Sequence, residues 1–220
     1  MQASGAREHP LVSDAPTAAV APEPRFPTPF GIPRLSAPPA VDGDPSGWNG
    51  AEFPVQETPA RQVSPSPASR LKVAYDANYL YVGLRVPLRP TDTLRRGNAW
   101  GVDDGAEVCV QSLAGKKPGP IYVVHGFLNG QFESVTDAGA TAAQAQALAA
   151  GTRYAAVVGR EQWSATWALP WSALGVKPVA GAKLAFNVGL RRSATNEWLQ
   201  WAGSLAQTWV VSQAGTLELR

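Results

Sequence analysis

The chain has 220 residues, which suits one sizeable domain with a tail or two small domains. Only 16% of the residues are charged, and 19 basic against 17 acidic side chains without a basic block argue against a nucleic-acid partner. The single cysteine, Cys109, excludes an intrachain disulfide and a CxxC motif, and no apolar run approaches the ~18 residues of a membrane span.

The N-terminal segment, residues 1–36, holds seven prolines and little apolar periodicity. This composition indicates a disordered tail or linker, and the alternative is an extended segment around Phe26 to Ile32 laid along the domain surface. The first residues also lack the apolar core of a secretion signal. We therefore expect a folded domain over residues 37–220.

Short apolar stretches separated by turn residues fill the rest of the chain. Residues 139–150 suit either a short helix or a flexible excursion, and residues 170–174 suit a one-turn helix. Many short strands with almost no long helix predict an all-β fold, an antiparallel β-sandwich of jelly-roll type. The predicted strands are 70–76, 79–86, 106–111, 121–127, 131–135, 153–158, 163–169, 184–191 and 216–219, the first two joined by a tight turn at residues 76–78.

The eight tryptophans divide by their sequence neighbours. Those at 48, 163, 167 and 171 follow strand or turn patterns and are interpreted as core residues. Trp100, Trp198 and Trp201 lie among polar residues, where an indole is awkward to bury and suits a flat apolar platform bordered by hydrogen-bonding groups. A sugar needs such a platform. These three tryptophans therefore either form a ligand site or are buried in the core.

The acidic residues are a second candidate group. Asp103, Asp104 and Glu107 suit strand-entry capping, a cation or sugar hydroxyls better than glycosidase catalysis, because no partner pair is evident. Asp42 and Asp44 lie in a Gly/Pro turn, which is typical either of a solvated turn or of a Ca²⁺ site. A structural calcium ion is the one cofactor that the sequence suggests. No nucleophile motif is present, and His125 is interpreted as a hydrogen-bonded structural histidine.

Five segments, in order over residues 38–219, resemble the family 9 carbohydrate-binding modules and related DOMON-like β-sandwiches. They are PPAVDGDPSGWNGAEF, LKVAYDANYLYVGLRV, WGVDDGAEVCVQ, GREQWSATWALPWSALGVKPVAGAKLAFNVGLRR and EWLQWAGSLAQTWVVSQAGTLEL. The resemblance implies noncatalytic glycan binding, with a terminal sugar clamped by two tryptophans and bonded by a carboxylate and amides. By motif, Trp100 and Glu107 match the acidic strand, and Trp201, with Asn196 before it, matches the late loop.

These observations lead to an expected function and to its alternatives. We expect a carbohydrate-binding domain, not an enzyme, that is a monomer and works outside the cytoplasm, in the extracellular or periplasmic space. Its ligand residues would be Trp100, Trp201, Glu107, Asn196 and Trp198. The main alternative is a structural or protein-interaction sandwich with a degenerate sugar site, in which Trp100 and Trp201 are buried or apart. A haem-binding sandwich is disfavoured by the scarcity of histidine and methionine.

Overall fold

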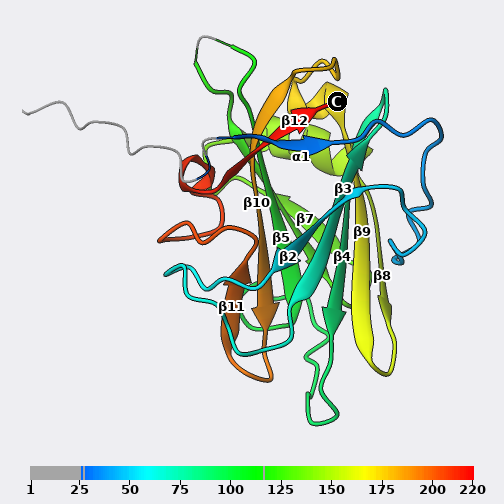
Figure 1. Ribbon diagram of the computed structural model, residues 1–220, viewed down its shortest axis with the longest axis vertical. Coiled ribbons are helices and arrows are strands. Elements are labelled where there is room, and N and C mark those ends of the chain that lie inside the picture. Colours follow the sequence, from blue (N-terminus) through cyan, green and yellow to red (C-terminus); the bar gives the residue numbers. More distant parts are fainter. Residues whose placement is uncertain (1–25, 27, 116) are drawn as a thin grey trace, which may run out of the picture.

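Two β-sheets packed face to face form the fold of the computed structural model, which describes residues 26, 28–115 and 117–220 (Figure 1). The first sheet has the order β1-β12-β10-β5-β6-β7, and β11 joins it by pairing with β10. Its strands are β1 Phe30–Ile32, β5 Gly105–Ser112, β6 Ile121–Phe127, β7 Phe132–Val135, β10 Lys183–Arg192, β11 Glu197–Gln200 and β12 Gly215–Leu219. All pairings in it are antiparallel except the parallel β1–β12 pair.

The second sheet is fully antiparallel and has the order β2-β3-β4-β9-β8. Its strands are β2 Ala51–Val55, β3 Ser69–Tyr75, β4 Tyr79–Pro87, β8 Arg153–Val158 and β9 Gln162–Pro170. The helices are α1 Ala142–Gly151, α2 Trp171–Leu174 and the 3-10 turn Val211–Gln213. None of the helices among the described residues is long and apolar enough to cross a membrane.

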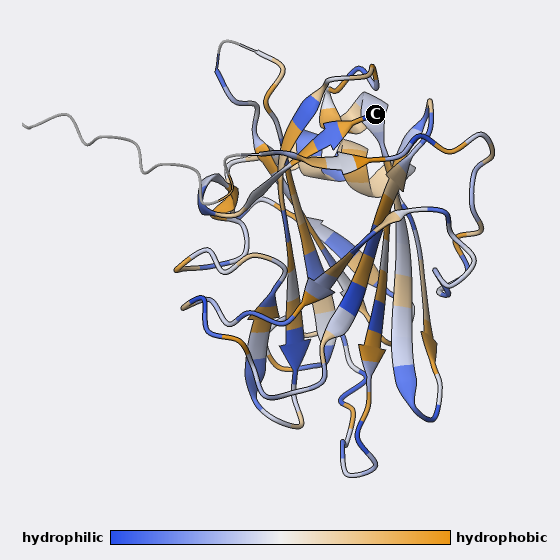
Figure 2. Cartoon of the chain, in the orientation of Figure 1, coloured by the Kyte–Doolittle hydropathy of each residue, from blue (hydrophilic) through white to orange (hydrophobic). Residues whose placement is uncertain are grey.

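The predicted β-sandwich is confirmed, and all nine predicted strands are present within one or two residues of the expected ends. Period-two alternation identifies them because one face of each strand is buried between the sheets, an alternation visible in the hydropathy colouring (Figure 2). Residues 139–150, for which the sequence suits either a helix or a flexible excursion, contain most of the helix α1. A capping box starts this helix: the side chains of Thr141 and Gln144 each accept a hydrogen bond from the backbone N–H of the other residue.

The core lies between the two sheets. Trp163, Trp167 and Trp171 are 1%, 0% and 3% exposed, so their interpretation as core residues is confirmed. Trp48 is also buried, but in a separate small cluster with Tyr81 on the other face of the second sheet. Deletion of any of these indoles would leave a large cavity.

The alternative to a disordered tail around Phe26 to Ile32, an extended segment against the domain, is what the structure shows, so the sandwich includes residues before 37. Strand β1 pairs in parallel with β12, and Ile32 is fully buried in the core. Phe26 and Phe30 pack against Trp201. The frequent prolines obscure this three-residue strand, because the apolar residues between them are too few to show a period. The prediction for residues 1–25 lies outside the described residues.

Candidate ligand-binding site

The outer face of the first sheet carries a row of polar residues. In the strand register Gln200 lies opposite Gly189, Gly189 opposite Glu107, Glu107 opposite His125, and His125 opposite Glu133. The alternation of each strand turns these residues away from the core, whereas the next residues along β5 and β6 are buried apolar ones. The sheet therefore places one histidine between two carboxylates.

His125 is the centre of this row. Its Nε2 lies 3.1 Å from Glu107 Oε2, and its Nδ1 lies 2.9 Å from Glu133 Oε1. The imidazole and Glu107 are almost fully buried, at 2% and 4% exposure, whereas the side chain of Glu133 is 47% exposed. Burial alone would lower the pKa of His125, but the bonds to the two carboxylates outweigh burial and raise this pKa above its ordinary value. The prediction of a hydrogen-bonded histidine is confirmed.

Trp100 covers His125 from the loop between β4 and β5. The two rings are stacked, with centroids 4.2 Å apart and planes 12° from parallel. Asp103 and Asp104 shape this loop, because Asp103 accepts a bond from a backbone N–H within the loop. Asp104 accepts bonds from the backbone N–H groups of Arg95 and Ser193. Of the three roles that the sequence leaves open for the acidic group, these backbone bonds match strand-entry capping for Asp103 and Asp104.

Trp198 lies on β11 in an edge-to-face contact with Trp100, with ring planes 76° apart and centroids 5.4 Å apart, and it is 38% exposed. Arg191 supports it from the facing position on β10, with its guanidinium carbon 5.2 Å from the centre of the indole. The same guanidinium donates to the carbonyl of Gly101, beside Trp100, and to Asn196 Oδ1 in the β10–β11 turn. Arg191 thus connects the backbones that carry the two tryptophans.

A pocket of about 330 Å³ opens between these indoles and the segment that follows β11. Gln200 holds that segment through bonds to the backbone of Ser204 and Ala206. Gly189 lets it approach the sheet, since a Cβ there would lie 2.3 Å from Thr208 Oγ1. The pocket is lined by Pro59, Trp100, Glu107, Trp198, Leu199, Gln200, Ala206, Gln207, Thr208 and Trp209. Three indoles and one buried carboxylate suit a flat ligand that has an apolar face and hydroxyl donors.

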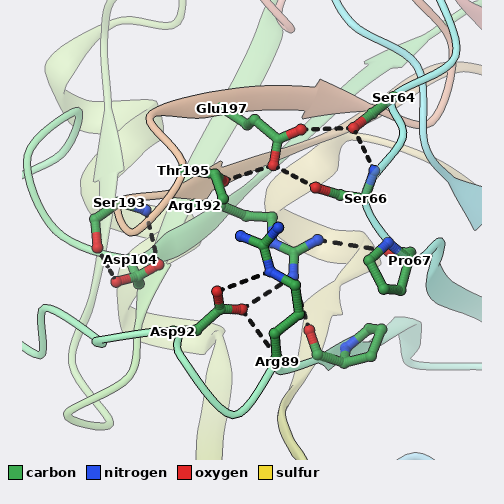
Figure 3. Close-up of polar contacts among 11 residues, drawn as sticks. Ser64, Ser66, Pro67, Arg89, Asp92, Asp104, Arg192, Ser193, Thr195 and Glu197 are labelled. Carbon is green, nitrogen blue, oxygen red and sulfur yellow. Dashed lines mark hydrogen bonds and ion pairs between the residues drawn. The ribbon is translucent and has the colours of Figure 1, made fainter.

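Two polar clusters, drawn in Figure 3, bond to β11 and to the loop between β4 and β5. In the first, Glu197 at the start of β11 accepts bonds from Ser64 at 2.5 Å, Ser66 at 2.7 Å and Thr195 at 2.5 Å. These bonds tie the strand of Trp198 to the loop between β2 and β3.

In the second cluster, Arg192 lies at the end of β10, and its side chain is buried, at 5% exposure. It donates to the carbonyls of Pro87 at 2.8 Å and Pro67 at 3.5 Å, and its Nη2 lies 3.6 Å from Asp92 Oδ2 (Figure 3). Arg192 therefore joins three segments of the chain, one of which leads to Trp100.

Replacing Glu197 with glutamine is expected to lower the free energy of unfolding by about 1.5–3 kcal/mol, the usual range for a bond to a charged group. Burial alone would raise the pKa of Glu197, but the hydroxyl bonds and Arg192 lower it. The extra unfolding free energy of wild type over Glu197→Gln is thus fully present above the ordinary glutamate pKa of about 4.3. It is lost as the pH falls through the lowered pKa of Glu197 in the folded protein. Urea unfolding at several pH values tests this, and equal stabilities at neutral pH would contradict it.

Trp201 does not lie in this pocket, which corrects its predicted pairing with Trp100. It is 7% exposed and packs among four phenylalanine rings of the core, those of residues 26, 30, 53 and 186. Its backbone N–H bonds to Val188, so the chain turns inward just after β11. Asn196 also lies outside the pocket lining, where it accepts a bond from Arg191.

The sequence reasoning missed one pocket tryptophan, Trp209. Its neighbours Gln207 and Thr208 are polar, which is the signal that drew attention to Trp100 and Trp198. The row formed by Glu133 and His125 was missed as well, because only the register of β6 and β7 brings the two together.

The predicted calcium residues lie elsewhere, in the turn before β2. The backbone N–H of Asp44 donates to Asp42 Oδ1, and Asp44 itself accepts two bonds from Ser46. Among the described residues, no group of three or more His, Cys, Asp or Glu side chains is arranged to hold a metal ion. Calcium takes six to eight oxygens, so backbone carbonyls and water would have to complete a site here, and calcium binding stays a prediction.

Comparison with solved structures places the fold beside known sugar-binding domains. A family 9 carbohydrate-binding module from Caldicellulosiruptor kristjanssonii in complex with cellotriose matches with a TM-score of 0.64 and 13% identity, over 88% of this chain and 94% of that one. The same organism's module in complex with glucose matches with a TM-score of 0.59 and 14% identity, over 86% and 95% of the two chains.

A putative carbohydrate-binding protein from Bacteroides uniformis ATCC 8492 matches with a TM-score of 0.63 and 14% identity, over 87% of this chain and 99% of that one. No protein-family model and no curated protein sequence matches the chain. The chain therefore has the β-sandwich fold of the family 9 modules, and the predicted resemblance is confirmed at the level of the fold.

Proposed function

We propose that the chain binds carbohydrate in the pocket between Trp100, Trp198 and Trp209, and that it binds without cleaving. The observation that carries this proposal is the convergence of three indoles on one buried carboxylate, Glu107. The structural similarity to modules solved with cellotriose and glucose supports it. The predicted ligand residues Trp100, Trp198 and Glu107 remain in the proposal, while Trp209 takes the place of Trp201.

The pocket offers a sugar two kinds of contact. The C–H face of a pyranose ring would pack on the exposed indole surface of Trp198 or Trp100, worth about 1 kcal/mol per ring beyond the area buried. A ring hydroxyl would donate to Glu107, a bond worth about 1.5–3 kcal/mol because the acceptor is charged. Against the cost of association, these contacts suit dissociation constants in the micromolar to millimolar range.

A noncatalytic role agrees with the acids available. Glycosidases use two carboxyl groups on either side of the scissile bond. Glu107 is the one carboxylate among the described residues that line the pocket, and one of its oxygens is taken by His125. The pocket thus suits holding a sugar better than protonating and displacing a leaving group.

Isothermal titration calorimetry with a panel of neutral mono- and disaccharides tests the proposal. The variant Glu107→Gln tests the role of the carboxylate most directly. We expect Glu107→Gln to weaken binding by about tenfold or more, because an amide is a weaker acceptor than a carboxylate. Glu161→Gln is the matched control, since Glu161 lies exposed in the turn between β8 and β9. Equal affinities of wild type and Glu107→Gln would remove Glu107 from the site.

A second candidate function is a protein-interaction sandwich without a working sugar site, for which we expect Trp100 and Trp201 to be buried or apart. The burial of Trp201 favours it, whereas Trp100 is only half-buried. The two functions separate in the same titration, because the interaction domain would bind no sugar of the panel.

Three further expectations belong to this proposal, of which the location alone follows from a glycan ligand. We place the protein in the extracellular or periplasmic space, as a monomer, and we retain a structural calcium ion at Asp42 and Asp44. Thermal unfolding with calcium and with chelator tests the ion: a higher melting temperature with calcium, absent in Asp44→Asn, would support it. Identical melting curves would exclude it.

A further inference from the structure

His125 holds two of the proposed ligand residues at once, although it does not line the pocket itself. One ring nitrogen pairs with Glu107, and the ring face stacks on Trp100. The other nitrogen pairs with Glu133, which lies outside the pocket lining and is half exposed. The imidazole therefore connects the solvent-exposed carboxylate of Glu133 to the buried carboxylate of Glu107 in the pocket.

The two hydrogen bonds of His125 require a particular protonation state. A carboxylate only accepts hydrogen bonds, and a neutral imidazole carries a single N–H. Only the doubly protonated imidazolium can therefore donate to Glu107 and Glu133 together. When the proton is lost, one carboxylate faces a nitrogen lone pair instead of a donor.

Loss of the proton affects Glu107 even when the remaining N–H stays on Nε2. Glu107 is 4% exposed, so water cannot readily replace the positive charge that the imidazolium holds beside its carboxylate, whereas Glu133 can turn to solvent. The indole of Trp100 rests on the same ring, and its negative face favours a cation beneath it. Deprotonation thus acts on both groups that the proposed sugar would touch.

We propose that His125 is a positioning residue whose imidazolium form holds Glu107 and Trp100 in place for the sugar, so that the protonation of His125 sets the upper pH limit of binding. This inference rests on the proposed function of the pocket. It adds to that function a regulation by pH and a residue, Glu133, that acts without touching the ligand.

The charged groups around His125 are few. Glu107 faces it from β5 and Glu133 from β7, and the raised pKa of His125 has these two carboxylates as its cause. Cys109, two residues further along β5, interacts with Glu107 and not with the imidazole. Arg191 on β10 directs its guanidinium to Trp198 and to backbone carbonyls.

The sign of the pH dependence follows from the raised pKa. Folded His125 keeps its proton above the ordinary histidine pKa of about 6.5. Its contribution to folding and to binding is thus full below that value and is lost as pH rises through the raised pKa. We expect sugar affinity to be constant in mild acid and to fall by about tenfold across the titration of His125, a change of about 1.4 kcal/mol.

The test combines imidazole NMR with calorimetry from about pH 5 to about pH 9, a range that covers ordinary histidine titration. The chain has two histidines, His9 and His125, so His9→Ala leaves a single imidazole signal that reports the pKa of His125 directly. Sugar affinity is measured on the same samples. We expect the midpoint of the affinity change to coincide with the NMR midpoint.

Glu133→Gln is the decisive variant, because it removes a negative charge beside His125 and leaves the pocket lining unchanged. Both midpoints should move to lower pH by the same amount, while Glu161→Gln should move neither. His125→Gln, which cannot titrate, should bind more weakly than wild type in mild acid and show no pH dependence in this range.

The possible failures are distinguishable. Sugar binding that stays constant through the titration of His125, or a Glu133→Gln variant that shifts the NMR midpoint alone, overturns the positioning role and leaves the proposed function intact. Absence of sugar binding at every pH overturns the proposed function and this inference with it.

Discussion

Trp100→Ala is expected to weaken sugar binding by at least about 2 kcal/mol, or roughly 30-fold in dissociation constant. The substitution removes the indole wall between the β4–β5 loop and Trp198, and it uncovers His125 and the floor of the pocket. From a micromolar to millimolar starting point, most sugars of the panel would bind too weakly to detect. Calorimetry measures the loss, and thermal unfolding checks that the variant is folded.

Because Trp100 is half-buried, a second variant separates binding from folding. Trp198→Ala truncates the more exposed ring, at 38% exposure, and should keep the melting temperature within a few degrees of wild type while weakening binding. If both variants bind sugar as wild type does, the pocket is not the sugar site.

Trp201→Ala is expected to cost about 3–5 kcal/mol of unfolding free energy, the usual range for deleting a buried aromatic side chain. The indole contacts rings from β1, β2 and β10, and so joins both sheets. It also fits closely against β12, where a Cβ on Gly215 would lie 2.3 Å from it. Removing it would therefore leave a cavity that rigid strands cannot close.

Urea unfolding measures this loss of stability. Sugar titration below the melting temperature should show that the folded variant still binds sugar, because Trp201 lies outside the pocket. Trp201→Phe, which keeps an aromatic ring in the cluster, should recover part of the lost stability. A Trp201→Ala variant with wild-type stability and no sugar binding would return Trp201 to the ligand site and contradict the placement argued here.

The strands that the sequence predicts are those whose alternation runs over six or more residues or ends at a clear turn. In β4, Leu80, Val82, Leu84 and Val86 alternate toward the core, and the turn at Asp76 is closed by its own carboxylate. Strands β2 and β11 were missed, and β1 was expected only as an extended segment; the three have three to five residues. Stretches that short carry few alternating positions, so the period is a weak signal in them, although β7 with its four residues was predicted.

The candidate site was predictable in part for the same reason. Polar neighbours drew attention to Trp100 and Trp198, which line the pocket, and also to Trp201, which is buried in the core. Neighbours along the chain do not say which side of a sheet a residue takes. Gln200 illustrates this: it is polar and yet 2% exposed, since its amide bonds to the backbone around the pocket. The pairing of His125 with Glu133 depends on register, which no local pattern encodes.

The indole N–H signals of the eight tryptophans test the central claim most directly. In a two-dimensional ¹H–¹⁵N spectrum recorded during addition of glucose and cellotriose, the signals of Trp100, Trp198 and Trp209 should shift and saturate together. Those of the buried tryptophans at 48, 163, 167, 171 and 201 should stay in place. Shifts confined to the buried group, or no shift with any sugar of the panel, would contradict carbohydrate binding in this pocket.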